Sequence, residues 1–266
     1  MSDVDTGRFP DGTFTPAPGA AAGPALLKKQ TRMETVLILR HGEQALLSLI
    51  IPLGMLVGLS LVPILDLEDP VQRVLPLTLA VAAMSAGFTG QAIALGFDRK
   101  YGALKRIGAS GLPKWGIISG KVGAVAIVVT IQFALILATA VALGFRADFI
   151  HVLLAYLFTM LGAASFSTMG LLMGGTLKGE VILALANIVW FALMGVAALV
   201  AVGPAMAPAL ETALTFIPSV ALTQGLISLL DGPGVGLLFP ILVLVGWGLL
   251  CGAAAVRLFR FEAPRS

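Results

Sequence analysis

The chain has 266 residues, of which 58% are hydrophobic and 12% are charged, and its mean hydropathy is +0.99. A soluble domain carries about 25% charged residues, so this chain lacks the charge to cover a water-soluble surface. The formal net charge of +3 fits basic loops at one face of a membrane, and no nucleic-acid partner is expected. Composition therefore predicts an all-α protein that crosses the bilayer several times.

The N-terminal region contains no membrane span. Residues 1–25 are rich in Gly, Pro, Ala and Thr and lack the apolar core of a signal peptide, so we expect a disordered cytoplasmic tail. Residues 26–43 place Lys28, Lys29, Arg32 and Arg40 around an apolar run that is too short to cross about 30 Å of hydrocarbon. We expect a helix lying along the cytoplasmic interface; a helical lead-in to the first span is the alternative.

Six apolar stretches follow, each near the roughly 20 residues that a helix needs to cross a bilayer. The segment before the last stretch, 203–234, is broken by four prolines into pieces too short to span. It predicts two re-entrant helices on the extracellular side, shielded from lipid. The transmembrane domain is therefore expected over 26–260, with a cytoplasmic tail at 261–266 and spans at about 44–65, 74–97, 115–143, 152–176, 181–202 and 236–256.

The basic residues set the expected orientation. With six spans, both termini lie on one side, and nearly all Lys and Arg residues fall on that side. Only Arg73 and Arg146 fall on the opposite side. Cytoplasmic loops of membrane proteins are enriched in Lys and Arg. We therefore expect a multi-pass protein of a bacterial inner membrane with both termini in the cytoplasm.

Residues for chemistry are scarce along the chain. The interiors of the expected spans contain no ionisable group, and these are what an ion-coupled transporter requires. The chain also lacks the G-x-x-x-x-G-K-[ST] loop of an ATP site. One cysteine, Cys251, and two distant histidines do not suggest a metal site. We predict no catalytic, cofactor or metal residue, and hence a protein that is not itself an enzyme.

The most informative segment is the basic loop after the second expected span, residues 98–115. Tyr101 and Leu104 stand at helical spacing, which predicts an apolar edge on a short helix with basic residues turned elsewhere. Such an edge can fill a groove on a soluble partner. The alternative is a basic cytoplasmic loop without a partner.

This loop resembles the signature of type-2 ABC exporter permeases. In that family an acidic-Arg-Glu-x-Gly-Thr-Leu run is followed by a Thr-Pro turn, a basic-Trp pair and Gly-Lys. The chain departs from the pattern at Lys100, Ala103 and Gly111, which leaves the sub-family open. The expected layout of an interfacial helix, six spans and re-entrant helices before the sixth is similar too. The matching residues are Asp98, Arg99, Gly102, Leu104, Lys114, Trp115, Gly120 and Lys121.

The resemblance implies a permease subunit that exports a drug, lipid or other amphiphile. Two permeases, identical or related, would each dock on one of two separate ABC ATPase subunits, which hold ATP and Mg. The implied ATPase coupling helix contains Asp98, Arg99, Tyr101, Gly102, Leu104, Lys105 and Arg106. A translocation path lined from the second and fifth spans would involve Met84, Phe88, Gln91, Asn187, Trp190 and Phe191. The alternatives are an ion-coupled secondary transporter and a membrane assembly factor without transport activity.

Overall fold

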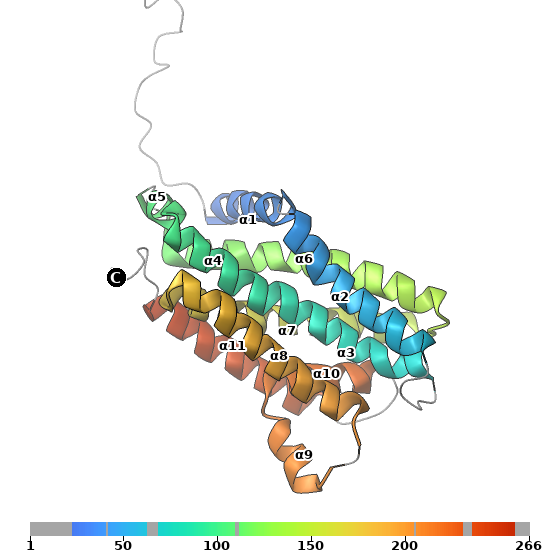
Figure 1. Cartoon of the computed structure of the whole chain (residues 1–266). Coiled ribbons are helices and arrows are strands. Elements are labelled where there is room, and N and C mark those ends of the chain that lie inside the picture. Colours follow the sequence, from blue (N-terminus) through green and yellow to red (C-terminus); the bar gives the residue numbers. More distant parts are fainter. Residues whose placement is uncertain are drawn as a thin grey trace, which may run out of the picture.

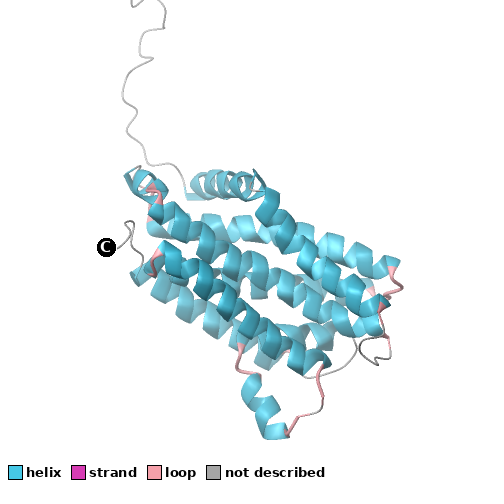
Figure 2. Ribbon diagram, in the orientation of Figure 1, coloured by secondary structure: helices cyan, strands magenta, loops and turns pink. Residues whose placement is uncertain are grey.

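The computed structural model describes residues 23–40, 42–62, 69–109, 112–204, 206–230 and 236–258. Within these ranges every regular element is a helix (Figure 1, Figure 2). The prediction of an all-α membrane protein is confirmed. The expected C-terminal tail and most of the expected N-terminal tail lie outside the described residues, although helix α1 already begins at Gly23.

Among the described residues, five helices are long and apolar enough to cross a membrane. Their apolar side chains can cover the hydrocarbon, and all backbone hydrogen bonds are made within each segment, as lipid requires. At 1.5 Å per residue the shortest of the five, with 21 residues, is about 31 Å long. They are the continuous helix Pro70–Lys100, formed by α3 (Pro70–Met84), the π-helical turn η2 (Ser85–Thr89) and α4 (Gly90–Lys100), then α6 (Lys114–Ala142), α7 (Phe149–Thr176), α8 (Gly179–Val202) and α11 (Leu238–Leu258).

Two further segments decide the span count. Helix α2 (Gly42–Leu61) has 20 residues and corresponds to the first predicted span, and side chains are described over its apolar stretch Ser48–Leu61. Helices α9 (Pro208–Leu214) and α10 (Pro218–Leu230) meet at a bend of 105°. This geometry suits either a re-entrant pair or one broken span, so six spans with a re-entrant pair stays a prediction.

Helix α7 lies at the centre of the bundle, where it packs against α3, α4, α6, α10 and α11. Glycines on α7 and on the facing span Pro70–Lys100 allow close contact between the two backbones, as small residues do in membrane helices. A Cβ added at Gly174 would lie 2.7 Å from the carbonyl oxygen of Ala92, and one at Gly87 would lie 2.8 Å from that of Ala163. The second predicted span therefore packs closely against α7.

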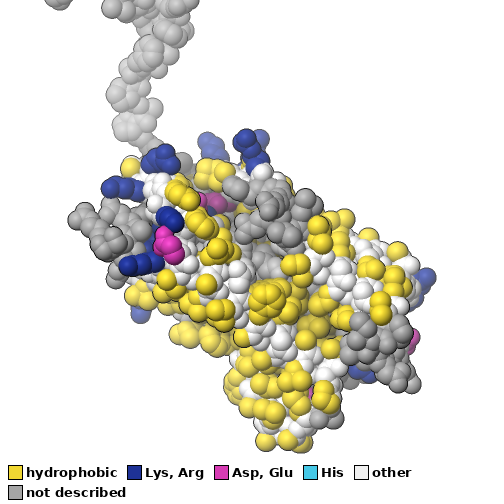
Figure 3. All heavy atoms as spheres, in the orientation of Figure 1, with side chains coloured by type: hydrophobic (Ala, Val, Ile, Leu, Met, Phe, Trp, Pro, Cys, Tyr) yellow, Lys and Arg dark blue, Asp and Glu magenta, His cyan; other side chains and the backbone are white. Residues whose placement is uncertain are grey.

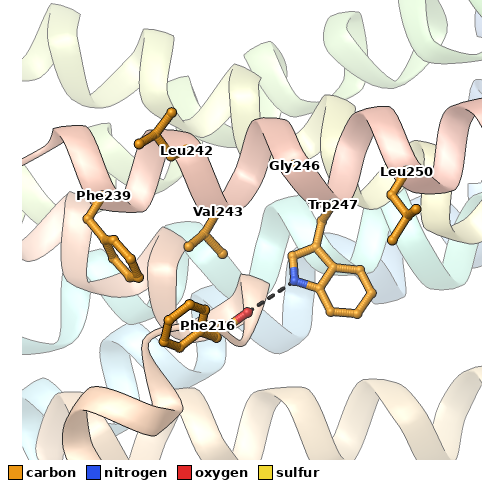
Figure 4. Close-up of a pocket in the computed structure, with 7 residues that line it drawn as sticks. All are labelled: Phe216, Phe239, Leu242, Val243, Gly246, Trp247 and Leu250. Atoms are coloured by element: carbon orange, nitrogen blue, oxygen red, sulfur yellow. Dashed lines mark hydrogen bonds between the residues drawn. The ribbon is translucent and has the colours of Figure 1, made fainter.

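One end of the bundle collects most of the basic side chains. We call it the basic end: it carries α1 (Gly23–Arg40), the short helix α5 (Ala103–Ala109), the start of α8 and the end of α11 (Figure 1). In the space-filling view, Lys and Arg side chains gather there, and hydrophobic side chains cover the middle of the visible face (Figure 3). Arg73 and Arg146 belong to the opposite end, at the start of α3 and in the α6–α7 loop.

Candidate partner-docking loop

The loop from α4 through α5 to α6 is anchored at the basic end by Arg99. Its guanidinium Nη1 donates to the carbonyl oxygens of Gly174, at 2.7 Å, and Leu177, at 3.1 Å. These carbonyls lie at the C-terminal end of α7, where a cation also interacts favourably with the helix dipole. Arg99 is only 3% exposed, so it fastens the end of α4 onto the end of α7.

The neighbouring Asp98 joins a buried ionic cluster. Lys121 lies about two turns inside α6 and is 2% exposed. Its Nζ donates to Glu34 Oε2 on α1 at 2.8 Å and to Asp98 Oδ2 on α4 at 3.0 Å, and Gln30 Nε2 donates to Glu34 Oε1 at 3.0 Å. Buried charges are tolerated when they are paired and hydrogen-bonded. This ionic anchor ties α1, α4 and α6 together.

A third contact holds the same end of α4 to α8. Lys100 Nζ lies 2.8 Å from Glu180 Oε1, and the two side chains are 39% and 67% exposed. An exposed ion pair of this kind contributes little to stability. Lys100 therefore helps to orient the end of α4 more than it stabilises the fold. The resembled signature has an acidic residue at the position of Lys100. In this chain the acidic residue beside Lys100 is its partner, Glu180 of α8.

The short helix α5 is seated by Leu104, and this overturns part of the sequence prediction. Leu104 is fully buried in a cluster with Leu95, Ile117 and Leu171, whereas Tyr101 is 70% exposed. The prediction that Tyr101 and Leu104 form one exposed apolar edge is wrong. The reason is local: Gly102 has φ of +71°, a left-handed conformation that suits glycine and interrupts the helix between the two residues.

The exposed surface of this loop is therefore aromatic and basic. Tyr101 stacks on Phe97, with ring centroids 5.9 Å apart and planes at 11°, so its ring is held in place although it is exposed. Lys105 and Arg106 are exposed on α5. Of the predicted coupling residues, Tyr101, Lys105 and Arg106 face outward, whereas Arg99 and Leu104 are buried in the bundle.

The residues predicted to line a translocation path are divided between interior and surface. Met84, Phe88 and Gln91 are at most 3% exposed, and the π-helical turn η2 lies among them. Such turns are frequent at functional sites. In this structure, however, these side chains lie inside the chain's own core rather than along an open path.

The residues predicted from the fifth span behave differently. Trp190 is buried, whereas Phe191 is 60% exposed and packs edge-on against it, with ring centroids 4.9 Å apart. Asn187 is also exposed, and its Nδ2 donates to the carbonyl oxygen of Leu183 in its own helix. The structure therefore does not bring the six predicted path residues together on one surface.

The ionic anchor was missed from the sequence because its members are far apart in the chain. The available signal was Lys121, a charge about two turns into an apolar helix, which requires a counter-charge nearby when it is buried. In the part of the chain that the structure describes, no group of three or more His, Cys, Asp or Glu side chains could hold a metal ion.

The model of ABC-2 family transporter proteins matches residues 69–257. The chain belongs to the ABC-2 transporter family. No curated protein matches its sequence. The predicted resemblance is confirmed, and the chain is a membrane permease of an ABC transporter. The family match includes Asp98, Arg99 and Lys121 of this ABC-2 permease, but not α1, which supplies Glu34.

Proposed function

We propose that this ABC-2 permease is a half-transporter that exports an amphiphile such as a drug or lipid. Two permeases, identical or related, pair in the membrane. Each docks α5 and the preceding turn onto a separate ATPase subunit, which binds ATP and Mg. ATP binding draws the ATPases together, and the docked loops transmit that movement to the spans.

The seating of α5 is the observation that carries this proposal. A loop that transmits force must be stiff, because a flexible loop would absorb the movement. Leu104 fixes α5 in the core, Arg99 binds the end of α7, and Asp98 joins the ionic anchor. A displacement of α5 would thus reach α1, α4, α6 and α7 directly. A basic loop without a partner would have no need of these buried contacts.

The outward face of the same loop suits a protein partner. Tyr101 is a large exposed aromatic residue whose ring is already ordered by Phe97, and Arg106, five residues further along the chain, is exposed as well. Tyr and Arg are enriched among the residues that dominate binding energy at interfaces. Ordering before binding lowers the entropy that association costs.

The proposed orientation places the basic end in the cytoplasm. Basic residues favour the cytoplasmic face of a membrane, and the partner ATPases need cytoplasmic ATP. Arg73 and Arg146 are then external. A bacterial inner membrane with both termini inside accommodates this arrangement.

We further propose that the exposed face of α8 meets the second permease and the substrate path. Asn187 presents an amide on an apolar span, where a polar group prefers a hydrogen-bonding partner over lipid. Phe191 lies one helical turn further along and offers an aromatic surface to an amphiphile. Met84, Phe88 and Gln91 would contact substrate only if the packing of α3 and α4 against the rest of the bundle changed.

Capture from native membranes tests the proposal. A tagged chain is purified in mild detergent, co-purifying proteins are identified by mass spectrometry, and vanadate-sensitive ATP hydrolysis is measured. A P-loop ATPase that co-purifies and hydrolyses ATP is expected. If neither ATPase nor hydrolysis exceeds that of an unrelated tagged membrane protein, an assembly factor becomes the better account.

A further inference from the structure

Helix α1 is amphipathic in the reverse sense from a helix of a soluble protein. Its buried residues are the polar Gln30, Glu34 and Thr35. Its exposed residues include Met33 and Val36, which are 40% and 45% exposed. Apolar side chains on the outer face and polar ones on the inner face would be unfavourable in water. The outer face of α1 therefore fits a lipid environment.

The inner face explains why the helix cannot rotate to bury its apolar side. Glu34 is fixed by Lys121 of α6 at 2.8 Å. The side chain of Gln30 packs directly over Gly120, and that of Thr31 packs over Gly123, so that a Cβ at either glycine would collide with it. The ionic anchor thus prevents α1 from rotating about its own axis and keeps its outer face turned away from the bundle.

That outer face carries cations beside apolar side chains. Together they line a shallow, open hollow, which we call the groove and which is formed by α1 alone. The spacing of its lining residues repeats every three or four positions, which places them on one helix face. None of the lining residues is acidic, and the nearest carboxylate of α1, Glu34, is turned inward and paired. The lining residues are Lys29, Arg32, Met33, Val36, Leu37 and Arg40.

We propose that this groove binds an anionic phospholipid of the membrane leaflet at the basic end. The headgroup phosphate would be held by Lys29 and Arg32 or Arg40, since guanidinium and ammonium groups bind phosphate oxygens through charge-assisted hydrogen bonds. The acyl chains would lie against Met33 and Val36. Free phosphate would leave these apolar side chains in water, which is why the ligand is a lipid. The proposal does not depend on the ATPase partner.

The first test uses the unaltered chain. Native mass spectrometry measures binding of phosphatidylglycerol and of phosphatidylcholine with identical acyl chains to the purified protein. Each basic residue near an anionic surface contributes about fivefold to affinity, so three basic residues predict a preference for phosphatidylglycerol of roughly a hundredfold. Equal affinity for the two lipids overturns the proposal. Inorganic phosphate at millimolar concentration should not displace the bound lipid; displacement would indicate a simple anion site and would overturn it too.

A pair of variants locates the site. Lys29→Gln/Arg32→Gln removes two cations of the groove, and Lys178→Gln/Arg257→Gln removes two exposed cations from the same end outside it. The groove variant should lose roughly twentyfold in phosphatidylglycerol affinity, and the control should lose far less. Equal losses would show a diffuse surface charge effect and contradict a site on α1. Met33→Gln/Val36→Gln, which keeps the charges, should also weaken binding; unchanged affinity would contradict the acyl-chain contact.

Discussion

Lys121 Nζ on α6 lies 2.8 Å from Glu34 Oε2 on α1 and 3.0 Å from Asp98 Oδ2 on α4. One ammonium group thus joins α1, the α4 span that leads into the loop containing α5, and the α6 span that follows that loop. Removing this charge would leave a buried carboxylate without its partner. The position of the docking loop and the rotation of α1 both depend on it.

Replacing Lys121 by Met should lower the free energy of unfolding of the permease by about 3–5 kcal/mol, because Glu34 remains buried and uncompensated. Thermal unfolding of the purified chain in detergent measures this loss. Lys100→Met is the matched control, since it breaks an exposed ion pair and should leave the melting temperature nearly unchanged. Equal melting temperatures for the two variants would show that the ionic anchor does not stabilise the fold.

Leu104→Ala should destabilise the permease even when no ATPase is present. Leu104 is fully buried, and truncating a buried leucine typically costs about 2–5 kcal/mol. Limited proteolysis should then cut between Asp98 and Trp115 at lower protease concentrations. Tyr101→Ala, at an exposed site, should keep the protection of the wild type. If Leu104→Ala is as protected as the wild type, α5 is held by other contacts.

The lengths of the spans were readable from the sequence. Apolar runs at 115–143 and 181–202 became α6 over Lys114–Ala142 and α8 over Gly179–Val202, because a helix must cover the hydrocarbon wherever it packs. Which side of each helix faces inward could not be read. Spans are apolar all round, so periodicity does not separate the core side from the lipid side. Phe88 and Phe191 look alike in sequence, yet one is buried and the other exposed.

The site was predictable only in part for a related reason. The motif drew attention to Asp98–Arg99 and to Gly120–Lys121 as separate features, but their pairing depends on how α4, α6 and α1 meet. No sequence motif or spacing indicated a role for Glu34. The exposure of Tyr101 and the burial of Leu104 follow from a single left-handed glycine at position 102, which helical spacing does not foresee.

Gly174→Ala should destabilise the bundle, whereas Gly195→Ala should not. A Cβ at Gly174 would meet the Ala92 carbonyl oxygen at 2.7 Å and Leu95 Cβ at 2.9 Å, whereas one at Gly195 meets nothing within 4 Å. Forcing a methyl group into a packed contact costs about 1–3 kcal/mol. Thermal unfolding compares the two variants directly. Equal stability would mean that α7 and α4 pack less closely than described.

Reporter fusions test the proposed orientation. A fusion after Lys178, at the basic end, should report a cytoplasmic location, and fusions near Asp148 or Glu211 should report an external one. The physical reason is the concentration of Lys and Arg at the basic end. A cytoplasmic signal at Glu211 would contradict the proposed six-span topology, and a cytoplasmic signal at Asp148 would reverse the orientation.

The most direct test of the central claim is ATP hydrolysis by the captured complex when the outward face of the docking loop is changed. Tyr101→Ala/Arg106→Gln should weaken ATPase binding about thirtyfold, for a loss of roughly 2 kcal/mol, while the permease keeps its melting temperature. The matched control Phe149→Ala/Arg146→Gln removes an exposed aromatic and an exposed arginine at the opposite end. It should retain both the ATPase and its hydrolysis rate. If the loop variant captures as much ATPase and hydrolyses ATP as fast as the control, this loop is not the site at which the permease binds its ATPase subunit.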